Sequence, residues 1–164
     1  MNSQKMQQLV EQELLSSYDS LYRLAFTYVK NEADAMDIVQ ESSYRAIKNS
    51  SSVKNAAFIR TWIWRIVINT SLELLRRNQK EVSFDEAPEY GTEDIYLDFD
   101  TIDAFDILNE KERAVIVLRY FEERKLQEIA DVLEENLNTT KSILYRSLGK
   151  LRIKLTEGEL CHES

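Results

Sequence analysis

The apolar positions near the C-terminus recur with the period of an α-helix. Within 125–133, a single apolar face is formed at i, i+3, i+4 and i+7 by Leu126, Ile129, Ala130 and Leu133. After a polar break at 134–138, the same period returns in Leu144, Leu148, Leu151 and Leu155. The pattern predicts two amphipathic helices joined by a tight turn, which is the arrangement of a helix-turn-helix.

Helical periodicity also covers the N-terminal half of the chain. Apolar residues form one broad helical face over 14–29 that ends at Lys30-Asn31, and a second helix is predicted over about 32–47. After a polar turn at 49–55, a long helix is predicted over 56–80. Three glycines and one proline leave little material for the turns of a β-sheet protein. The predicted fold is therefore all-α.

Charge is distributed unevenly and divides the chain into parts. The formal net charge is -8, but residues 81–112 hold one base and twelve acids, whereas residues 1–80 hold eleven bases and eight acids. The stretch 81–103 also lacks a sustained helical period, which is typical of a linker. We therefore predict two small helical domains, an N-terminal helical bundle over 1–80 and a C-terminal helix-turn-helix domain over 104–164, joined by an acidic linker over 81–103. The linker is expected to be either a solvated spacer or a segment that covers a basic surface of the chain.

The second helix of the predicted helix-turn-helix is basic on the side away from its leucines. Five cations and no carboxylate lie between residues 137 and 154. Cations bind phosphates, and polar side chains of medium length reach base edges in the major groove, so the pattern favours a DNA-binding helix. The alternative is a solvated surface whose cations complement the helix dipole.

The long helix predicted over 56–80 combines cations with aromatic residues. Between residues 42 and 80 there are eight cations and one acid, Glu73. Such a surface suits melted nucleic acid, because unstacked bases can stack on aromatic rings. Trp62 falls within the apolar period and is predicted to be core, whereas Trp64 lies off that stripe and is predicted either to pack or to contact a partner.

Motifs for catalysis and metal binding are absent from the sequence. A lone Cys161 excludes an internal disulfide and a multi-cysteine zinc site, and the adjacent His162 is expected to be an unstructured tail residue. Nucleophile and nucleotide-loop motifs are missing, so we expect no enzymatic activity, no cofactor, no metal and no small-molecule substrate. No apolar run is long enough to span a bilayer and the N-terminus lacks the features of a signal peptide, which predicts a cytoplasmic protein.

Several segments, taken in order, resemble the bacterial RNA polymerase sigma factors of the extracytoplasmic-function (ECF) group. Residues 34–41, DAMDIVQE, are similar to the helix with which the family binds core polymerase. Residues 58–77, FIRTWIWRIVINTSLELLRR, are similar to the helix that melts and holds the promoter −10 element. Four further segments, 108–113, 118–122, 128–130 and 139–146, match the family's −35-reading domain in order and spacing. The resemblance covers about residues 14–155 and is specific as a combination.

This resemblance implies that the chain binds core RNA polymerase and directs it to particular promoters. The polymerase-binding surface would comprise Asp34, Asp37, Ile38, Val39, Gln40 and Glu41. The −10 element would be held by Asn49, Ser50, Ser51, Ser52, Lys54, Asn55, Arg60, Trp64, Arg65, Asn69, Arg76, Arg77 and Lys80. The −35 element would be contacted by Thr139, Thr140, Lys141, Ser142, Tyr145, Arg146 and Lys150. The family also implies control by an anti-sigma factor, which is often membrane-anchored.

The sequence departs from the family pattern at two places in the helix-turn-helix. Glu134-Glu135 stand where family members usually have glycine and an aliphatic residue, so Asn136 or Asn138 is expected to supply the left-handed backbone of the turn. Ile143 stands where an arginine is common, which predicts one missing phosphate or base contact.

Two other functions are compatible with the helical pattern alone. One is a conventional helix-turn-helix regulator, which would dimerise on a palindromic site without polymerase. The other is a protein-binding adaptor whose basic faces never meet DNA.

Overall fold

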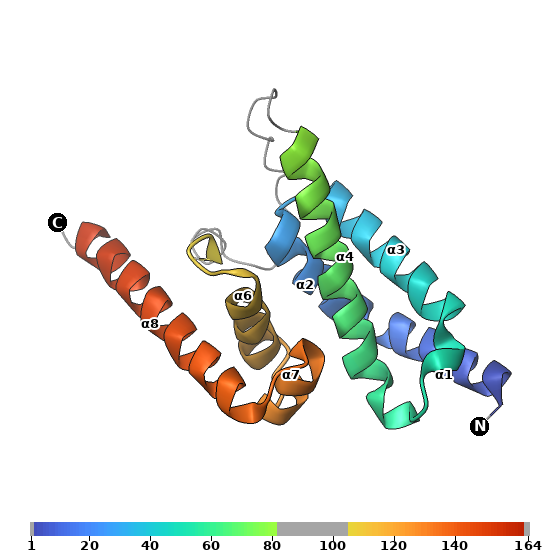
Figure 1. Cartoon of the computed structure of the whole chain (residues 1–164). Coiled ribbons are helices and arrows are strands. Elements are labelled where there is room, and N and C mark those ends of the chain that lie inside the picture. Colours follow the sequence, from blue (N-terminus) through green and yellow to red (C-terminus); the bar gives the residue numbers. More distant parts are fainter. Residues whose placement is uncertain (1, 82–104, 163–164) are drawn as a thin grey trace. The chain divides into compact units, whose positions relative to one another are not determined.

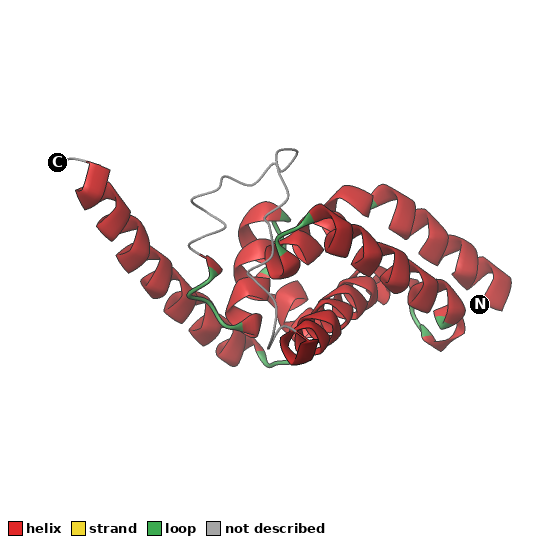
Figure 2. Ribbon diagram, turned by 90° about the horizontal axis from the view of Figure 1, so that it is seen from above, coloured by secondary structure: helices red, strands yellow, loops and turns green. Residues whose placement is uncertain are grey.

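A computed structural model describes residues 2–81 and 105–162, and every regular element in this part of the chain is helical (Figure 1, Figure 2). The prediction of an all-α fold is confirmed. The chain divides into two compact units, Met1–Thr92 and Glu93–Ser164, each with its own core. The predicted acidic linker lies outside the described residues, except for Glu81 at the end of the first unit's last helix.

The first unit begins with two helices, α1 (Ser3–Ser16) and α2 (Tyr18–Val29). The single helix predicted over 14–29 is wrong, because the backbone leaves the helical conformation at Ser17 (φ -103°, ψ 8°). The Ser17 hydroxyl donates a hydrogen bond to Glu13 Oε1 at 2.8 Å, which satisfies a polar group at the break. As a result Leu15, predicted on the apolar face, is 81% exposed.

Helix α3 (Glu32–Lys48) starts where the polar pair predicted a boundary. Lys30 ends α2 in the left-handed conformation (φ 61°), and the side chain of Asn31 caps α3 by accepting the Asp34 N–H at 2.8 Å. A capping side chain satisfies one of the backbone donors that a helix start leaves unpaired. The boundary is therefore set locally by two residues.

The predicted long helix is α4, which spans Ile59–Glu81. Two 3-10 helices, η1 (Ser50–Ser52) and η2 (Ala56–Phe58), connect it to α3. The predicted start at residue 56 is therefore a 3-10 turn that leads into the α-helix.

Helices α2, α3 and α4 pack against one another around an apolar core (Figure 1). Its most deeply buried side chains include Leu21, Leu24, Phe26, Ile38, Ile63 and Val67. Trp64 belongs to this core and is only 3% exposed, whereas Trp62 is half-buried. The prediction that Trp62 is core is wrong, and of the two roles left open for Trp64 the structure shows packing. The reason is that the buried positions of α4 are 59, 63, 64, 67, 68, 70 and 71, which leave residue 62 out.

The second unit contains α6 (Glu110–Ile116), the π-helical turn η3 (Val117–Phe121), α7 (Leu126–Leu133) and α8 (Leu137–His162). Its core includes Phe105, Val115, Leu118, Ile129 and Leu144. Helix α7 begins one residue after the predicted start, and α8 begins at Leu137, inside the predicted polar break, so the predicted helix-turn-helix is present with a shorter turn.

The turn between α7 and α8 is made differently from the expectation. Glu134 itself takes the left-handed conformation (φ 56°, ψ 40°), while Asn136 caps α8 by accepting the Thr139 N–H at 2.7 Å. Glu135 forms an ion pair with Lys111 of α6. The expectation that Asn136 or Asn138 takes the left-handed conformation is wrong, because capping α8 requires Asn136 to lie outside that region.

The turn predicts opposite effects for two substitutions. Glu134→Gly should raise the free energy of unfolding by about 0.5–1 kcal/mol, because glycine adopts this conformation without the Cβ clash. Asn136→Ala should lower it by about 1 kcal/mol through loss of the cap. Denaturant unfolding of the full chain measures both, and a destabilised Glu134→Gly would contradict the account of the turn.

Candidate functional site

The surface of α3 separates the predicted polymerase-binding residues into two groups. Asp37, Gln40 and Glu41 are exposed, whereas Ile38 and Val39 are 1% and 3% exposed and belong to the core. Asp34 is partly exposed, and its carboxylate accepts a hydrogen bond from Asn31 Nδ2 at 2.9 Å in the helix cap. Within the segment 34–41, a partner can therefore contact the polar side chains, whereas Ile38 and Val39 pack beneath them in the core.

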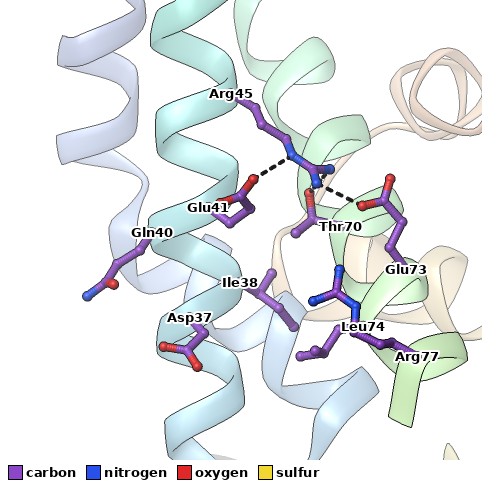
Figure 3. A pocket seen from close by; sticks show the side chains of 9 residues that line it. All are labelled: Asp37, Ile38, Gln40, Glu41, Arg45, Thr70, Glu73, Leu74 and Arg77. Carbon is purple, nitrogen blue, oxygen red and sulfur yellow. Dashed lines mark hydrogen bonds and ion pairs between the residues drawn. The ribbon is translucent and has the colours of Figure 1, made fainter. Parts of the chain in front are cut away.

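A pocket of about 480 Å³ lies between this face of α3 and α4 (Figure 3). Arg45 reaches across it from α3: its guanidinium lies 3.0 Å from Glu41, 2.9 Å from Glu73 and 3.2 Å from Thr70 Oγ1. The hydrogen bond to Glu73 is the largest cause that raises the pKa of Arg45, with Glu41 adding to it and burial opposing it. The lining residues are Asp37, Ile38, Gln40, Glu41, Arg45, Thr70, Glu73, Leu74 and Arg77.

Arg45 is not among the residues that the sequence predicted for this surface. The i,i+4 spacing of Glu41 and Arg45 is a signal that could have found half of the cluster. No local spacing links either residue to Glu73, which is brought there by the packing of α4 on α3.

The loop predicted to hold a flipped −10 base presents mostly exposed polar side chains. Exposed are Asn49, Ser51, Ser52, Lys54 and Asn55, whereas Ser50 is buried. The loop is held by its own hydrogen bonds, from Asn49 Nδ2 to the Arg45 carbonyl at 2.9 Å and from the Ser52 hydroxyl to the Asn49 carbonyl at 2.7 Å. It therefore has a defined shape in the free chain.

The predicted DNA-contacting residues of α4 lie in different environments. Asn69, Arg76 and Arg77 are exposed, and Arg65 is partly exposed. Arg60 forms an ion pair with Glu13 of α1, with Nε 2.6 Å from the carboxylate. The burial of Trp64 corrects its assignment as a DNA contact, because its indole ring is part of the core. The side chain of Lys80 lies outside the described part of the chain.

On α8, the predicted −35 contacts form an exposed side with one exception. Lys141, Ser142 and Tyr145 are exposed, and Tyr145 is 66% exposed. Thr140 is fully buried, and its hydroxyl donates to the Asn136 carbonyl at 2.9 Å, which corrects its assignment to the DNA surface. Thr139 is partly exposed at the capped start of the helix.

Ile143 is 4% exposed and packs in the core of the second unit. The side chain points into the fold and not toward the exposed side of α8, so the expectation of a missing DNA contact at this position stays a prediction.

The last two predicted −35 contacts, Arg146 and Lys150, share one buried carboxylate. Glu112 of α6 is fully buried, with Arg146 Nε 2.8 Å from its Oε2 and Lys150 Nζ 2.7 Å from its Oε1. Glu112 also forms a capping box with Asn109: Asn109 N–H donates to Glu112 Oε1 at 2.8 Å and Glu112 N–H donates to Asn109 Oδ1 at 2.9 Å. This cluster, here called the Glu112 cluster, fastens α6 to α8.

The charge of Glu112 depends on these partners. Burial, the largest single effect, raises the pKa of Glu112, but the hydrogen bonds from Asn109, Lys150 and Arg146 outweigh it and hold the pKa below its ordinary value. The carboxylate is therefore ionised in the folded protein at neutral pH. The spacing of Asn109 and Glu112 is a capping-box signal in the sequence, but nothing local joins them to Arg146, 34 residues away.

Within the described residues, no cluster of histidine, cysteine, aspartate and glutamate has a geometry that would hold a metal ion. The same part of the chain holds no helix with the length and apolarity needed to cross a membrane. Cys161 and His162 form the end of α8, so the expectation of an unstructured tail at His162 is wrong, and their side chains lie outside the described residues.

Comparison with known proteins identifies the family of this chain. Sigma-70 region 2 matches residues 14–81, and sigma-70 region 4 matches residues 104–152. RNA polymerase sigma factor SigV of Bacillus subtilis is 45% identical over 143 residues, which cover 85% of this chain and 86% of the relative. The ECF RNA polymerase sigma factor SigW of the same organism is 29% identical over 159 residues, which cover 85% of this chain and 84% of the relative.

A solved structure has the same fold. It is the sigma factor RpoE of Bartonella quintana in a co-crystal with the anti-sigma factor NepR, with a TM-score of 0.74 and 23% identity over 89% of this chain and 96% of that one. The chain belongs to the sigma-70 family and is a sigma factor of the ECF group. Such a factor binds core RNA polymerase and directs initiation at particular promoters. The presence of region 2 beside region 4 excludes the conventional helix-turn-helix regulator and the adaptor.

The Glu112 cluster predicts a pH dependence of stability. Because folding lowers the pKa of Glu112, the cluster contributes stability that is fully present above the ordinary pKa of 4.5 and is lost as the pH falls through the lower folded value. We expect the free energy of unfolding to fall more steeply on acidification for the wild type than for Glu112→Gln, whose amide does not titrate.

Denaturant unfolding followed by circular dichroism, repeated from neutral pH to below the ordinary pKa, measures this difference. Glu123→Gln, an exposed substitution in the same unit, is the control. Parallel pH profiles for the wild type and Glu112→Gln would contradict the assignment of an ionised Glu112.

Proposed function

We propose that the exposed side of α3 is the surface that binds core RNA polymerase. The observation that carries the proposal is that Asp37 and Gln40 stand exposed in the middle of a helix whose other faces are packed. Three carboxylates, those of Asp37, Glu41 and Glu73, border the pocket beside them. Arg45 pairs with Glu41 and Glu73, so the exposed carboxylate of Asp37 is the group best placed to meet a basic partner, because complementary charge favours association and fixes register.

The −10 element is bound by the exposed loop between α3 and α4 and by the exposed basic residues of α4. The loop supplies the hydroxyls and amides of Asn49, Ser51, Ser52 and Asn55 together with Lys54, and the helix supplies Asn69, Arg76 and Arg77. Polar groups of this kind hold an unstacked base and its backbone. Trp64 takes no part in this surface, because it is buried.

The −35 element is bound by the exposed side of α8. Lys141, Ser142, Tyr145, Arg146 and Lys150 lie along this side, and all follow the capped start of the helix. A recognition helix places its N-terminal part against base edges in the major groove. The residues nearest the cap are therefore the ones that meet the bases.

The remaining parts of the proposal concern control and location. An anti-sigma factor holds the chain inactive. Support for this part of the proposal comes from the fold that the chain shares with RpoE, which was solved in complex with the anti-sigma factor NepR. The anti-sigma factor would be recognised as a protein that binds the chain stoichiometrically and blocks holoenzyme assembly in a purified system. The chain acts in the cytoplasm, where core polymerase and the promoters lie.

Asp37→Arg tests the polymerase surface. The substitution should weaken binding to core polymerase by about 100-fold or more, because like charges facing each other across an interface cost several kcal/mol. Fluorescence titration of the labelled full chain with core polymerase measures the affinity. Asp19→Arg, the same charge change at an exposed position of α2, is the matched control and should bind as the wild type does. Equal affinities for both variants would remove α3 as the surface.

Lys141→Ala tests the −35 surface in the assembled holoenzyme. If Lys141 contacts a phosphate, the slope of log affinity against log salt should become shallower by about 1. If it contacts a base, binding should lose about 1–3 kcal/mol at one −35 position. Lys5→Ala on α1 is the control, with the same charge change at an exposed site of the other unit. Unchanged affinity and slope for Lys141→Ala would mean that this side of α8 is only solvated.

A further inference from the structure

Two cations on the exposed side of α8 are fixed at one end inside the protein. Arg146 and Lys150 are 55% and 40% exposed, while the Glu112 carboxylate that both contact is 0% exposed. Arg146 Nε and Lys150 Nζ are therefore tied to a buried carboxylate, although the side chains that carry them are partly exposed. A solvated lysine or arginine has no such anchor and samples many rotamers.

The bond to Arg146 restrains the part of the side chain that faces outward. Glu112 Oε2 accepts from Nε, at 2.8 Å, so neither terminal nitrogen is needed for this contact. Because the guanidinium is planar and rigid, fixing Nε also fixes the direction of the terminal nitrogens. Those nitrogens form the fork that binds a phosphate or a guanine edge.

The anchor is itself held by the backbone. Glu112 accepts the Asn109 N–H at 2.8 Å on Oε1, the oxygen that also accepts from Lys150 Nζ at 2.7 Å. The capping box at the start of α6 therefore sets where the carboxylate lies, and the carboxylate sets where the two cations lie.

We propose that Glu112 is a positioning residue for recognition of the −35 element. Its carboxylate holds Arg146 through Nε, in the orientation in which the terminal guanidinium nitrogens meet DNA, and it fixes the position of Lys150 Nζ beside them. The proposal rests on the proposed role of α8 and adds to it a residue that does not touch DNA itself.

Two physical effects follow from this arrangement, and both raise discrimination between promoter and other DNA. The rotamer entropy of Arg146 is lost on folding and is not lost again on binding, which favours the specific complex. Glu112 also compensates one of the two positive charges, which weakens the phosphate attraction that acts on any sequence. Removing its charge should therefore weaken specific binding and strengthen non-specific binding.

The test uses Glu112→Gln in the reconstituted holoenzyme. The probes are a promoter selected by the wild-type holoenzyme from a randomised library, the same duplex with its −35 element scrambled, and the same duplex with its −10 element scrambled. We expect the affinity ratio of intact to −35-scrambled promoter to fall about tenfold, as for loss of one good base contact. The ratio for the −10 element should stay within twofold, and the salt slope on scrambled DNA should steepen by about 1.

Two matched variants separate positioning from stability. Asn109→Ala removes the side chain that caps α6, but the backbone N–H of residue 109 and both cations still donate to the Glu112 carboxylate. This variant should therefore lower the midpoint of thermal unfolding without changing −35 discrimination. In the background Arg146→Lys, Glu112→Gln should reduce discrimination by clearly less than tenfold, because most of its effect passes through the guanidinium.

Each result decides the proposal. A −35 ratio within twofold of wild type for Glu112→Gln, or an equal loss for Asn109→Ala at matched stability, would overturn it, as would tighter specific binding. If circular dichroism shows that Glu112→Gln does not fold, Glu112→Asp takes its place: its shorter carboxylate keeps the charge but moves it, and unchanged discrimination would again overturn the proposal. If Lys141→Ala also leaves −35 binding unchanged, the proposed role of α8 fails, whereas an effect of Lys141→Ala alone removes only the role of Glu112.

Discussion

The second unit depends on the charge of one buried side chain. Glu112 brings together the start of α6 and two cations of α8, and its burial means that water cannot replace any of these partners. Leaving a buried charge without its partner costs about 3–5 kcal/mol, a large part of the stability of a small domain. The same carboxylate therefore holds α6 against α8 and fixes the positions of Arg146 Nε and Lys150 Nζ.

Ion pairs contribute less to the stability of the first unit. Arg45 joins α3 to α4, and Arg60 joins α4 to Glu13 of α1. Apart from Glu13, the side chains of these pairs are 34–51% exposed: Arg45, Glu41, Glu73 and Arg60. Partly exposed pairs contribute about 0–1 kcal/mol each, so the apolar core carries the stability of this unit. What Arg45 contributes is geometry: it fixes Glu41 and Glu73 at the edge of the pocket beside Asp37. The acidic groups of the proposed polymerase surface are in this way held in place within the free chain.

The two units thus prepare their surfaces in the same manner. A partly exposed cation is bonded to a carboxylate on a neighbouring helix: Arg45 of α3 to Glu73 of α4, and Arg146 of α8 to Glu112 of α6. A count of exposed charges would overestimate the attraction of α8 for DNA, because Glu112 compensates part of it. It would also miss that the compensated cations are the ones with a defined direction. For a factor that must choose promoters among many other sequences, direction matters more than total charge.

Much of this architecture follows from the sequence by itself. Periodicity placed α3, α4, α7 and the start of α8 to within a few residues, because helix formation and capping are decided by residues three or four positions apart. The motifs 34–41 and 139–146 indicated the family. The break at Ser17, the left-handed Glu134, the burial of Trp64 and the ties from Glu112 to α8 did not follow from it. These features depend on which faces of distant helices meet. A side chain off the apolar stripe becomes core only when a neighbour covers it, and Glu112 meets Arg146 across 34 residues only after α6 and α8 have packed. Local spacing determined the helices and the fold class, whereas tertiary packing decided which charged residues are exposed and which are bonded between helices.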